Sequence, residues 1–325
     1  MTIPFATILM PLDGFHRKDF ILRILSVGEI LWDVFEKEEF LGGAPLNFAV
    51  SAQRLGNTVS LLTAVGADTR GTLATCSMRN VGISTDLVQT VPSIGTATAI
   101  VTADASGSAT FTFRRPAAFD FVALDESSLS EISRLQPDWI YFGTLAHTTE
   151  EAEQRLKHLL DTNPCAKRFY DINLRDGHWN LDLVQRLSRL ASVIKLNEAE
   201  AEKLFELVDD SLQFSIEAFC KSWSSNYGGE VICVTLGSQG CAVWQDGQVH
   251  IFGGFPVTVV DTVGAGDAFT AAFLHGYQCG WPLDRTASFA NALGAIVASR
   301  AGATPIWTIE ECQKLMVVSS AAGQL

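Results

Sequence analysis

The sequence lacks long hydrophobic runs, paired cysteines and an excess of positive charge. No apolar run reaches the ~18 residues that a membrane-spanning helix needs, so we expect no membrane partner. The seven cysteines are scattered without a C-x-x-C pair, which predicts reduced core thiols in a cytoplasmic protein. Lys and Arg total 23 against 36 Asp and Glu, and this net charge of −13 argues against nucleic acid as a partner.

Several motifs of known chemistry are also missing. The chain contains no G-x-x-x-x-G-K-[ST] phosphate-binding loop, no H-E-x-x-H zinc motif and no G-x-S-x-G nucleophile motif. The dinucleotide-binding fingerprint fails because Phe269 stands where its third glycine belongs, which argues against a nicotinamide-dependent oxidoreductase. Residues 1–20 lack a basic start and contain Pro11, so we expect an N-terminal extension and not a signal peptide.

From residue 21 onward, short apolar runs alternate with amphipathic stretches. With 47% hydrophobic and 18% charged residues, the 325-residue chain has the composition of a globular protein with a large core. Because apolar strands separated by helices form parallel sheets covered on both faces, we predict one large α/β domain over 21–325. The expected strands are 21–27, 59–65, 139–142, 168–172, 193–196 and 231–235, and the expected helices are 45–55, a segment after Asp68, 149–160, 181–190 and 199–207.

Two stretches interrupt this alternation and predict a smaller second sheet. Residues 30–41 follow the first strand with no helix between them. Residues 85–115 contain two segments that alternate apolar and polar side chains, 96–102 and 108–113, around a polar turn at 104–107. Such alternation is typical of a sheet with one face in water. Inserted strands of this kind serve as decoration, as a lid or as a dimer-forming sheet, and the sequence leaves these alternatives open.

The strongest local signal is the segment 261–269, which reads Asp-Thr-Val-Gly-Ala-Gly-Asp-Ala-Phe. A β-like run at 257–260 precedes it and apolar residues at helical spacing follow, so we expect the glycines at a strand-to-helix junction. The first N–H groups of a helix have no partner within the helix and carry partial positive charge, which creates an anion site without basic side chains. Asp267 in this junction is a candidate general base, although an acidic residue there also simply favours the helix dipole.

The segment 261–269 resembles the C-terminal signature of the ribokinase-like (PfkB-type) sugar kinases. Residues 42–49 resemble the Gly-Gly signature of the same family, and Gly66-Ala67-Asp68 continues the match, which covers nearly the whole chain from Ile21 to about Pro305. The resemblance implies a ribokinase-like three-layer α/β/α sandwich with a mostly parallel sheet and a small β-sheet lid, whose strands are inserted at about 30–41 and 85–115. It also implies transfer of the γ-phosphate of ATP to a sugar hydroxyl, with fructokinases as the nearest branch.

Residue roles follow from the resemblance position by position. Asp267 would take the proton of the sugar hydroxyl, and the N–H groups of Gly264, Ala265 and Gly266 would surround the transferring phosphoryl group. The motif Asp171-x-Asn173-x-Arg175 resembles one in fructokinases and 2-keto-3-deoxygluconate kinases. The residues implied in sugar binding are Asp33, Gly42, Gly43, Asn47, Arg115, Asn173 and Arg175.

The resemblance also assigns a nucleotide side and a metal to the site. The residues implied in ATP binding are Lys195, Asn197, Thr235, Gly237, Gly240 and Asn291. Asn197 and Glu200 form the N-x-x-E motif that is associated with Mg²⁺, and Glu200 would act on Mg²⁺ through water. The same spacing also makes a helix capping box, and both roles can hold. Asp261 and the segment 300–303 match the region where relatives hold a monovalent cation such as K⁺.

Two questions stay open at this stage. The first is the sugar, because Arg114 stands where the fructokinase lid segment commonly has a tyrosine, beside the matched Arg115. If both arginines face the substrate, an acidic sugar such as 2-keto-3-deoxygluconate becomes the alternative. The second is the assembly, because the lid of relatives can form a homodimer. A non-catalytic sugar or nucleotide sensor on the same fold would be expected to lack Asp267 or a glycine of its turn, and all are present.

Overall fold

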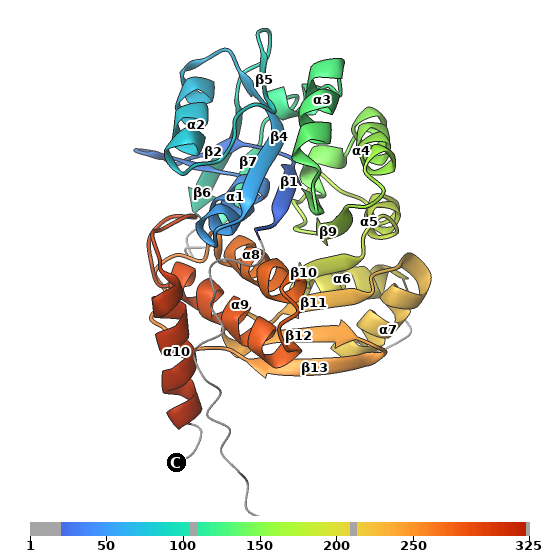
Figure 1. Cartoon of the computed structure of the whole chain (residues 1–325), viewed down its shortest axis with the longest axis vertical. Coiled ribbons are helices and arrows are strands. Elements are labelled where there is room, and N and C mark those ends of the chain that lie inside the picture. Colours follow the sequence, from blue (N-terminus) through green and yellow to red (C-terminus); the bar gives the residue numbers. More distant parts are fainter. Residues whose placement is uncertain (1–20, 104–108, 209–212, 323–325) are drawn as a thin grey trace, which may run out of the picture.

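The computed structural model of the chain describes residues 21–103, 109–208 and 213–322. The expected extension 1–20 and the polar turn at 104–107 lie outside the described residues. Within them, a nine-stranded sheet forms the centre of the molecule (Figure 1). Its strands are β1 (Arg23–Val27), β4 (Thr58–Gly66), β5 (Val88–Val91), β8 (Trp139–Gly143), β9 (Lys167–Asp171), β10 (Val193–Asn197), β11 (Val231–Thr235), β12 (Gly240–Gln245) and β13 (Gln248–Gly253).

The strands lie in the order β13-β12-β11-β10-β9-β8-β1-β4-β5. Neighbours from β11 to β5 are parallel, while β12 pairs antiparallel with both β11 and β13. The six strands expected from apolar runs are therefore confirmed. Because the strands from β5 to β11 run in one direction, their carboxyl ends meet at one edge of the sheet, where ligands bind in open α/β folds.

Helices cover both faces of the large sheet, as predicted, with one buried apolar cluster on each face. Polar N-caps start several of them: Asp68, Asp125, Thr149, Asn180 and Ser215 each accept a backbone N–H of the first turn. One face carries α1 (Ala44–Arg54), α2 (Thr69–Asn80), α8 (Ala265–Gln278), α9 (Leu283–Ala298) and α10 (Ile309–Ala322). The other carries α3 (Glu126–Leu135), α4 (Glu150–Thr162), α5 (Leu181–Ser188), α6 (Glu198–Val208) and α7 (Ile216–Tyr227).

A separate sheet of four strands lies at one side of the large sheet (Figure 1). It has the order β3-β2-β6-β7, from β2 (Leu31–Val34), β3 (Glu39–Gly42), β6 (Ala97–Ala103) and β7 (Ala109–Phe113). The smaller second sheet is thus confirmed, but the second insertion is shorter than 85–115. β5 belongs to the large sheet, where it pairs in parallel with β4. The chain leaves β4, crosses over through α2 and returns beside β4 as β5.

Two other expectations were wrong. Residues 257–260 form a loop and not a strand, although the run is rich in valine. Val259 and Val260 are 57% and 61% exposed, so this loop packs too little apolar surface to act as a core strand. The cysteines are free, as expected, but Cys76 and Cys165 are exposed, so they are not core thiols.

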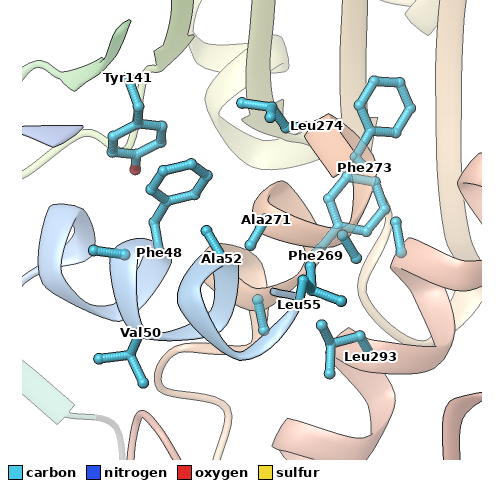
Figure 2. Packing of buried hydrophobic residues seen from close by; sticks show 14 of the residues in the cluster. Phe48, Val50, Ala52, Leu55, Tyr141, Phe269, Ala271, Phe273, Leu274 and Leu293 are labelled. Atoms are coloured by element: carbon cyan, nitrogen blue, oxygen red, sulfur yellow. The ribbon is translucent and has the colours of Figure 1, made fainter. Parts of the chain in front are cut away.

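The packing of α1 against α8 connects the two signature segments. Figure 2 shows Phe48 of α1 beside Tyr141 of β8, with Phe269 and Phe273 of α8 and Leu293 of α9 in the same buried cluster. The rings of Phe48 and Tyr141 stack with centroids 4.0 Å apart. Because such dense packing fixes the two helices relative to each other, the residues at their N-terminal ends keep a constant separation.

Candidate active site

The turn before α8 is fixed by glycine conformation and by one carboxylate. Gly264 is the N-cap of α8 with φ +78°, and a Cβ there would stand 2.0 Å from the carbonyl oxygen of Ala303. Asp261 accepts hydrogen bonds from the N–H groups of Val263 and Gly302, each at 3.0 Å. The predicted helix start is confirmed, but a loop leads into it in place of the expected strand.

Asp267 lies in the first turn of α8 and is buried. Its Oδ2 accepts a hydrogen bond of 2.9 Å from Nδ2 of Asn47, so the two signature segments meet at this carboxylate. Burial raises the pKa of Asp267 to about 6, and the charge of Asp171 acts in the same direction. Lys195, Asn47 and Arg175 oppose that rise. A carboxylate with a pKa near 6 is ionised at neutral pH and is more basic than an exposed one.

A buried ion pair stands next to this turn. Nζ of Lys195 lies 3.1 Å from Oδ1 of Asp171, and their side chains are 8% and 0% exposed. A Cβ at Gly266 would lie 3.1 Å from Nζ of Lys195, so the ammonium group borders the backbone of the α8 first turn. The N–H of Ala265 donates to the carbonyl oxygen of Thr262 at 3.3 Å. The Lys195 ammonium group therefore lies next to the helix N-terminus, where its charge adds to the partial positive charge of the first N–H groups.

A cavity of about 620 Å³ opens on the other side of the same turn, between the ends of β10 and β11 and helices α8 and α9. Its volume is in the range of small-molecule sites. Asn291 donates to the carbonyl oxygens of Phe252 (3.3 Å) and Gly253 (3.1 Å), which ties α9 to β13 at the cavity wall. Most residues expected to bind ATP line this cavity, together with Ala265 and Gly266 of the turn: Asn197, Thr235, Gly237, Gly240 and Asn291.

Lys195 is the remaining predicted ATP residue, and it stands behind the turn and not in the cavity wall. The loop before α8 supplies much of the cavity lining: Val257 and Val259 come from the run expected to be a strand, and Phe255 and Pro256 precede that run. Sequence reasoning assigned Val257 and Val259 to a strand and gave no role to Phe255 or Pro256.

Glu200 and Asn197 form the capping box that the spacing predicts. Oδ1 of Asn197 accepts from the N–H of Glu200, and Oε2 of Glu200 accepts from the N–H of Asn197, both at 2.9 Å. Oε1 of Glu200 also accepts from the N–H of Leu174 at 2.7 Å, which ties α6 to the segment after β9. Burial raises the pKa of Glu200, while Lys195 opposes the rise. The hard oxygen donors that Mg²⁺ requires are therefore present at this position.

The small sheet brings Asp33 and the glycine pair to the same edge. A Cβ at Gly42 would lie 2.9 Å from Oδ2 of Asp33, so the carboxylate rests against the bare glycine backbone. Gly43 has φ +107°, and a Cβ there would stand 2.6 Å from the carbonyl oxygen of Glu29. Burial raises the pKa of Asp33 to about 6, and Arg175 opposes the rise. The predicted sugar residues of the first signature thus lie together, with Arg175 close enough to act on them electrostatically.

Asn173 and the two lid arginines take different environments. Asn173 has φ +42°, a conformation that asparagine tolerates, in the loop after β9. Arg115 forms an ion pair with Asp120 and donates from NH1 to the carbonyl oxygen of Leu145 at 2.8 Å. Arg114 is exposed. The two arginines therefore do not converge on one acceptor in this structure.

Sequence reasoning missed Glu29, which follows β1 and is 5% exposed. Its Oε2 has no hydrogen-bond partner among the described residues. Burial raises its pKa to about 7, and Arg175, Asp267 and Arg115 also act on it. The signal available was an acidic residue directly after a strand that ends at the ligand-binding edge of the sheet. Its burial was not predictable, because it requires the later segment between β3 and α1 to pack against Glu29.

In residues 21–103, 109–208 and 213–322, no group of three or more His, Cys, Asp or Glu side chains is arranged as a metal site. No helix in the same ranges combines the length and the apolar character needed to cross a bilayer.

A model of the pfkB family carbohydrate kinases matches residues 19–309. The chain belongs to the pfkB family of carbohydrate kinases. It is therefore a phosphotransferase with an alcohol group as acceptor, as the resemblance implied. It is 31% identical to fructokinase-1 of Oryza sativa subsp. japonica over 92% of this chain and 94% of that one.

Two solved structures share the fold of this carbohydrate kinase. A fructokinase with bound ATP from Xylella fastidiosa superposes with a TM-score of 0.80 and 24% identity, over 92% of this chain and all of that one. A 2-dehydro-3-deoxygluconokinase from Thermotoga maritima superposes with a TM-score of 0.81 and 20% identity, over 92% and 99% of the two chains. The ribokinase-like fold class is thereby confirmed.

Proposed function

We propose that this kinase transfers the γ-phosphoryl group of ATP to a hydroxyl group of fructose. The observation that carries the proposal is the buried Asp267 carboxylate in the first turn of α8. This turn also lines the cavity of about 620 Å³, through Ala265 and Gly266. The fructokinase relative from rice, which aligns with nearly the whole chain, supports fructose as the acceptor.

The reaction needs positioning and charge stabilisation more than covalent chemistry by the protein. Asp267 accepts the proton of the sugar hydroxyl while the hydroxyl oxygen forms a bond to the γ-phosphorus. The bond between that phosphorus and the bridging oxygen breaks, and its electron pair leaves with ADP. Gly264, Ala265 and Gly266 direct the N-terminal end of α8 at the phosphoryl oxygens, and Lys195 adds a full positive charge.

Two metal ions belong to this proposal. Glu200 would hold Mg²⁺ through water, and Mg²⁺ would supply neutralisation of the phosphate charge when bound. Asp261 and the turn at 300–303 would hold a monovalent cation such as K⁺, whose role is to steady the turn before α8. Dialysis against sodium salts followed by readdition of KCl tests the second ion: turnover independent of KCl would remove Asp261 as a cation ligand.

A 2-keto-3-deoxygluconate kinase is the second candidate, supported by the fold shared with the Thermotoga maritima enzyme. Binding of its carboxylate needs a cation that faces the sugar. Arg114 is exposed and Arg115 already pairs with Asp120, which favours a neutral sugar. Arg175, whose charge acts on the Asp33 carboxyl, is the cation that an acidic sugar would have to recruit.

A substrate panel tests the proposal. Initial rates of ADP release are measured with ATP and Mg²⁺ on fructose, ribose, adenosine and 2-keto-3-deoxygluconate. We expect the highest kcat/KM on fructose. Activity confined to adenosine would overturn the fructokinase assignment, and preference for the acidic sugar would establish the second candidate.

We also propose a homodimer formed through the small sheet, located in the cytoplasm. Phe35, directly after β2, and Phe40 of β3 are 39% and 45% exposed and pack edge-to-face on each other, with centroids 5.7 Å apart. Exposed aromatic pairs of this kind are enriched in interfaces. The free thiols suit a reducing compartment. Light scattering of the protein and of a Phe40→Asp variant tests the dimer: monomers in both samples would contradict it.

A further inference from the structure

Asp171, the last residue of β9, collects three hydrogen-bonding side chains from three other elements. Nζ of Lys195 on β10 lies 3.1 and 3.3 Å from its two oxygens. The Tyr141 hydroxyl of β8 donates to Oδ2 at 3.3 Å, and the Thr270 hydroxyl of α8 lies 3.2 Å from the same oxygen. Asp171 is 0% exposed, so these groups replace all of its contact with water.

A buried ion pair of this kind is weak evidence for a role in stability. Removing two charges from water costs about as much as their attraction returns, and apolar residues of the same volume often serve a core equally well. Burial lowers the pKa of Lys195, but Asp171, Glu200 and Asp267 more than offset this effect. Lys195 is therefore an ammonium ion at neutral pH. Because burial disfavours this charge, its stability depends mainly on Asp171.

The pair also has a defined position relative to the reacting groups. Nζ of Lys195 borders the Gly266 backbone, at 3.1 Å from the point where a Cβ would lie. Thr270 links Asp171 to the same turn, since its hydroxyl also lies 2.9 Å from the carbonyl oxygen of Gly266. The aromatic ring of Tyr141 is held by stacking on Phe48 of α1. The contacts of Asp171 thus set where the Lys195 charge stands against the first turn of α8.

We propose that Asp171 is a positioning residue for phosphoryl transfer: it holds the Lys195 ammonium group against the α8 turn, where that charge stabilises the transferring phosphoryl group. The inference rests on the proposed function. Asp171 is fully buried, and its whole contribution passes through Lys195. Loss of Asp171 should therefore resemble loss of Lys195 and should add nothing once Lys195 is gone.

A double-mutant cycle tests this dependence with Asp171→Asn, Lys195→Met and the combined variant. At pH 8, where Asp267 is ionised, we expect each single variant to lose about 10²–10³-fold in kcat, the range for a preorganised charged or hydrogen-bonding group. KM for the sugar should change by less than about threefold. The combined variant should be no slower than Lys195→Met within about threefold. Losses that multiply in the combined variant would overturn the proposal, as would near-normal kcat in Asp171→Asn.

ATP affinity measured by calorimetry without sugar supplies a readout that does not depend on turnover. Both single variants should weaken ATP binding by a similar factor, about tenfold, and the combined variant by no more than that. Asp138→Asn is the matched control, because Asp138 pairs with Arg23 at the opposite ends of the strands and should leave kcat and ATP affinity unchanged. Since no sugar is present, failure of fructose as a substrate would leave this part of the test intact.

Tyr141→Phe keeps the test decisive if Asp171→Asn does not fold. It removes one donor to Asp171 and retains the ring that stacks on Phe48. We expect kcat to fall about threefold to tenfold in the otherwise native protein and to stay constant when the same change is made in Lys195→Met. An equal loss in both backgrounds would show that Tyr141 acts independently of Lys195, which contradicts the proposal.

Discussion

Replacement of Asp267 by asparagine should separate catalysis from stability. The amide oxygen of an asparagine can still accept the hydrogen bond from Asn47, so the contact between α1 and α8 is retained. The base is lost, and general-base catalysis contributes about 10²–10⁴-fold to a rate. We therefore expect Asp267→Asn to lower kcat by about that factor, or about 3–5 kcal/mol of transition-state stabilisation.

The free energy of unfolding should instead increase in Asp267→Asn, because the native carboxylate is buried. Its pKa rises from 3.8 to about 6 in the folded protein, mainly because of burial. Below about pH 4 the carboxyl is protonated in both the folded and the unfolded protein, so its burial does not lower the free energy of unfolding. Above about pH 6 it is ionised in both states, and the full destabilisation by the buried charge is present. The difference corresponds to about 3 kcal/mol at pH 8. Asp267→Asn should thus raise the free energy of unfolding at pH 8 by up to that amount.

The assays are steady-state turnover and chemical denaturation at pH 8. Asp138→Asn is the matched control, since the hydrogen bond from Arg23 holds the pKa of Asp138 below its usual range. That variant should lose a little stability and keep its turnover. Turnover of Asp267→Asn within tenfold of the native protein would refute the assignment of Asp267 as the base. A loss of stability at pH 8 would refute the account of its burial.

Three further predictions concern pH, the turn before α8 and the nucleotide cavity. Because Asp267 must be ionised to accept a proton, kcat/KM should fall about tenfold per pH unit below about pH 6, and the residual rate of Asp267→Asn should lack this limb. Gly264→Ala should destabilise the protein by more than about 2 kcal/mol and lose turnover, because its Cβ would meet Ala303 at 2.0 Å. Gly56→Ala has a similar φ, +92°, but open space around it, so it should cost less and leave turnover unchanged in the same melts and assays. Asn291→Ala should raise KM for ATP about tenfold with KM for the sugar unchanged, since two carbonyl groups of the cavity wall lose their donor; equal changes in both would exclude a nucleotide-side role.

The strands were predictable where burial on both faces left a single interpretation. Runs such as 193–196 and 231–235 are largely apolar, and the structure places them in the parallel sheet. The run at 257–260 is similarly rich in valine but lines the nucleotide cavity as a loop, so its apolar content alone does not separate the two cases. β5 was assigned to the wrong sheet because strand partners depend on the path of the chain and not on local alternation.

The motifs predict which residues gather at the candidate site, but they do not predict the electrostatics of that site. The motifs at 42–49 and 261–269 were both assigned to the site, and the structure joins them through the hydrogen bond from Asn47 to Asp267. The buried carboxyl groups of Glu29 and Asp171 acquire their surroundings from segments far apart in the chain. No local pattern encodes a burial that arises only when β2, β8, β10 and α8 have come together.

Phosphorus NMR of the native protein with ATP, Mg²⁺ and fructose tests the central claim most directly, because it follows the transferred group itself. Our account predicts that a sugar phosphate monoester and ADP form in equal amounts, and that Asp267→Asn forms both at a rate lower by about 10²–10⁴-fold. Release of inorganic phosphate without a sugar phosphate, or no consumption of ATP with any sugar of the panel, would contradict it.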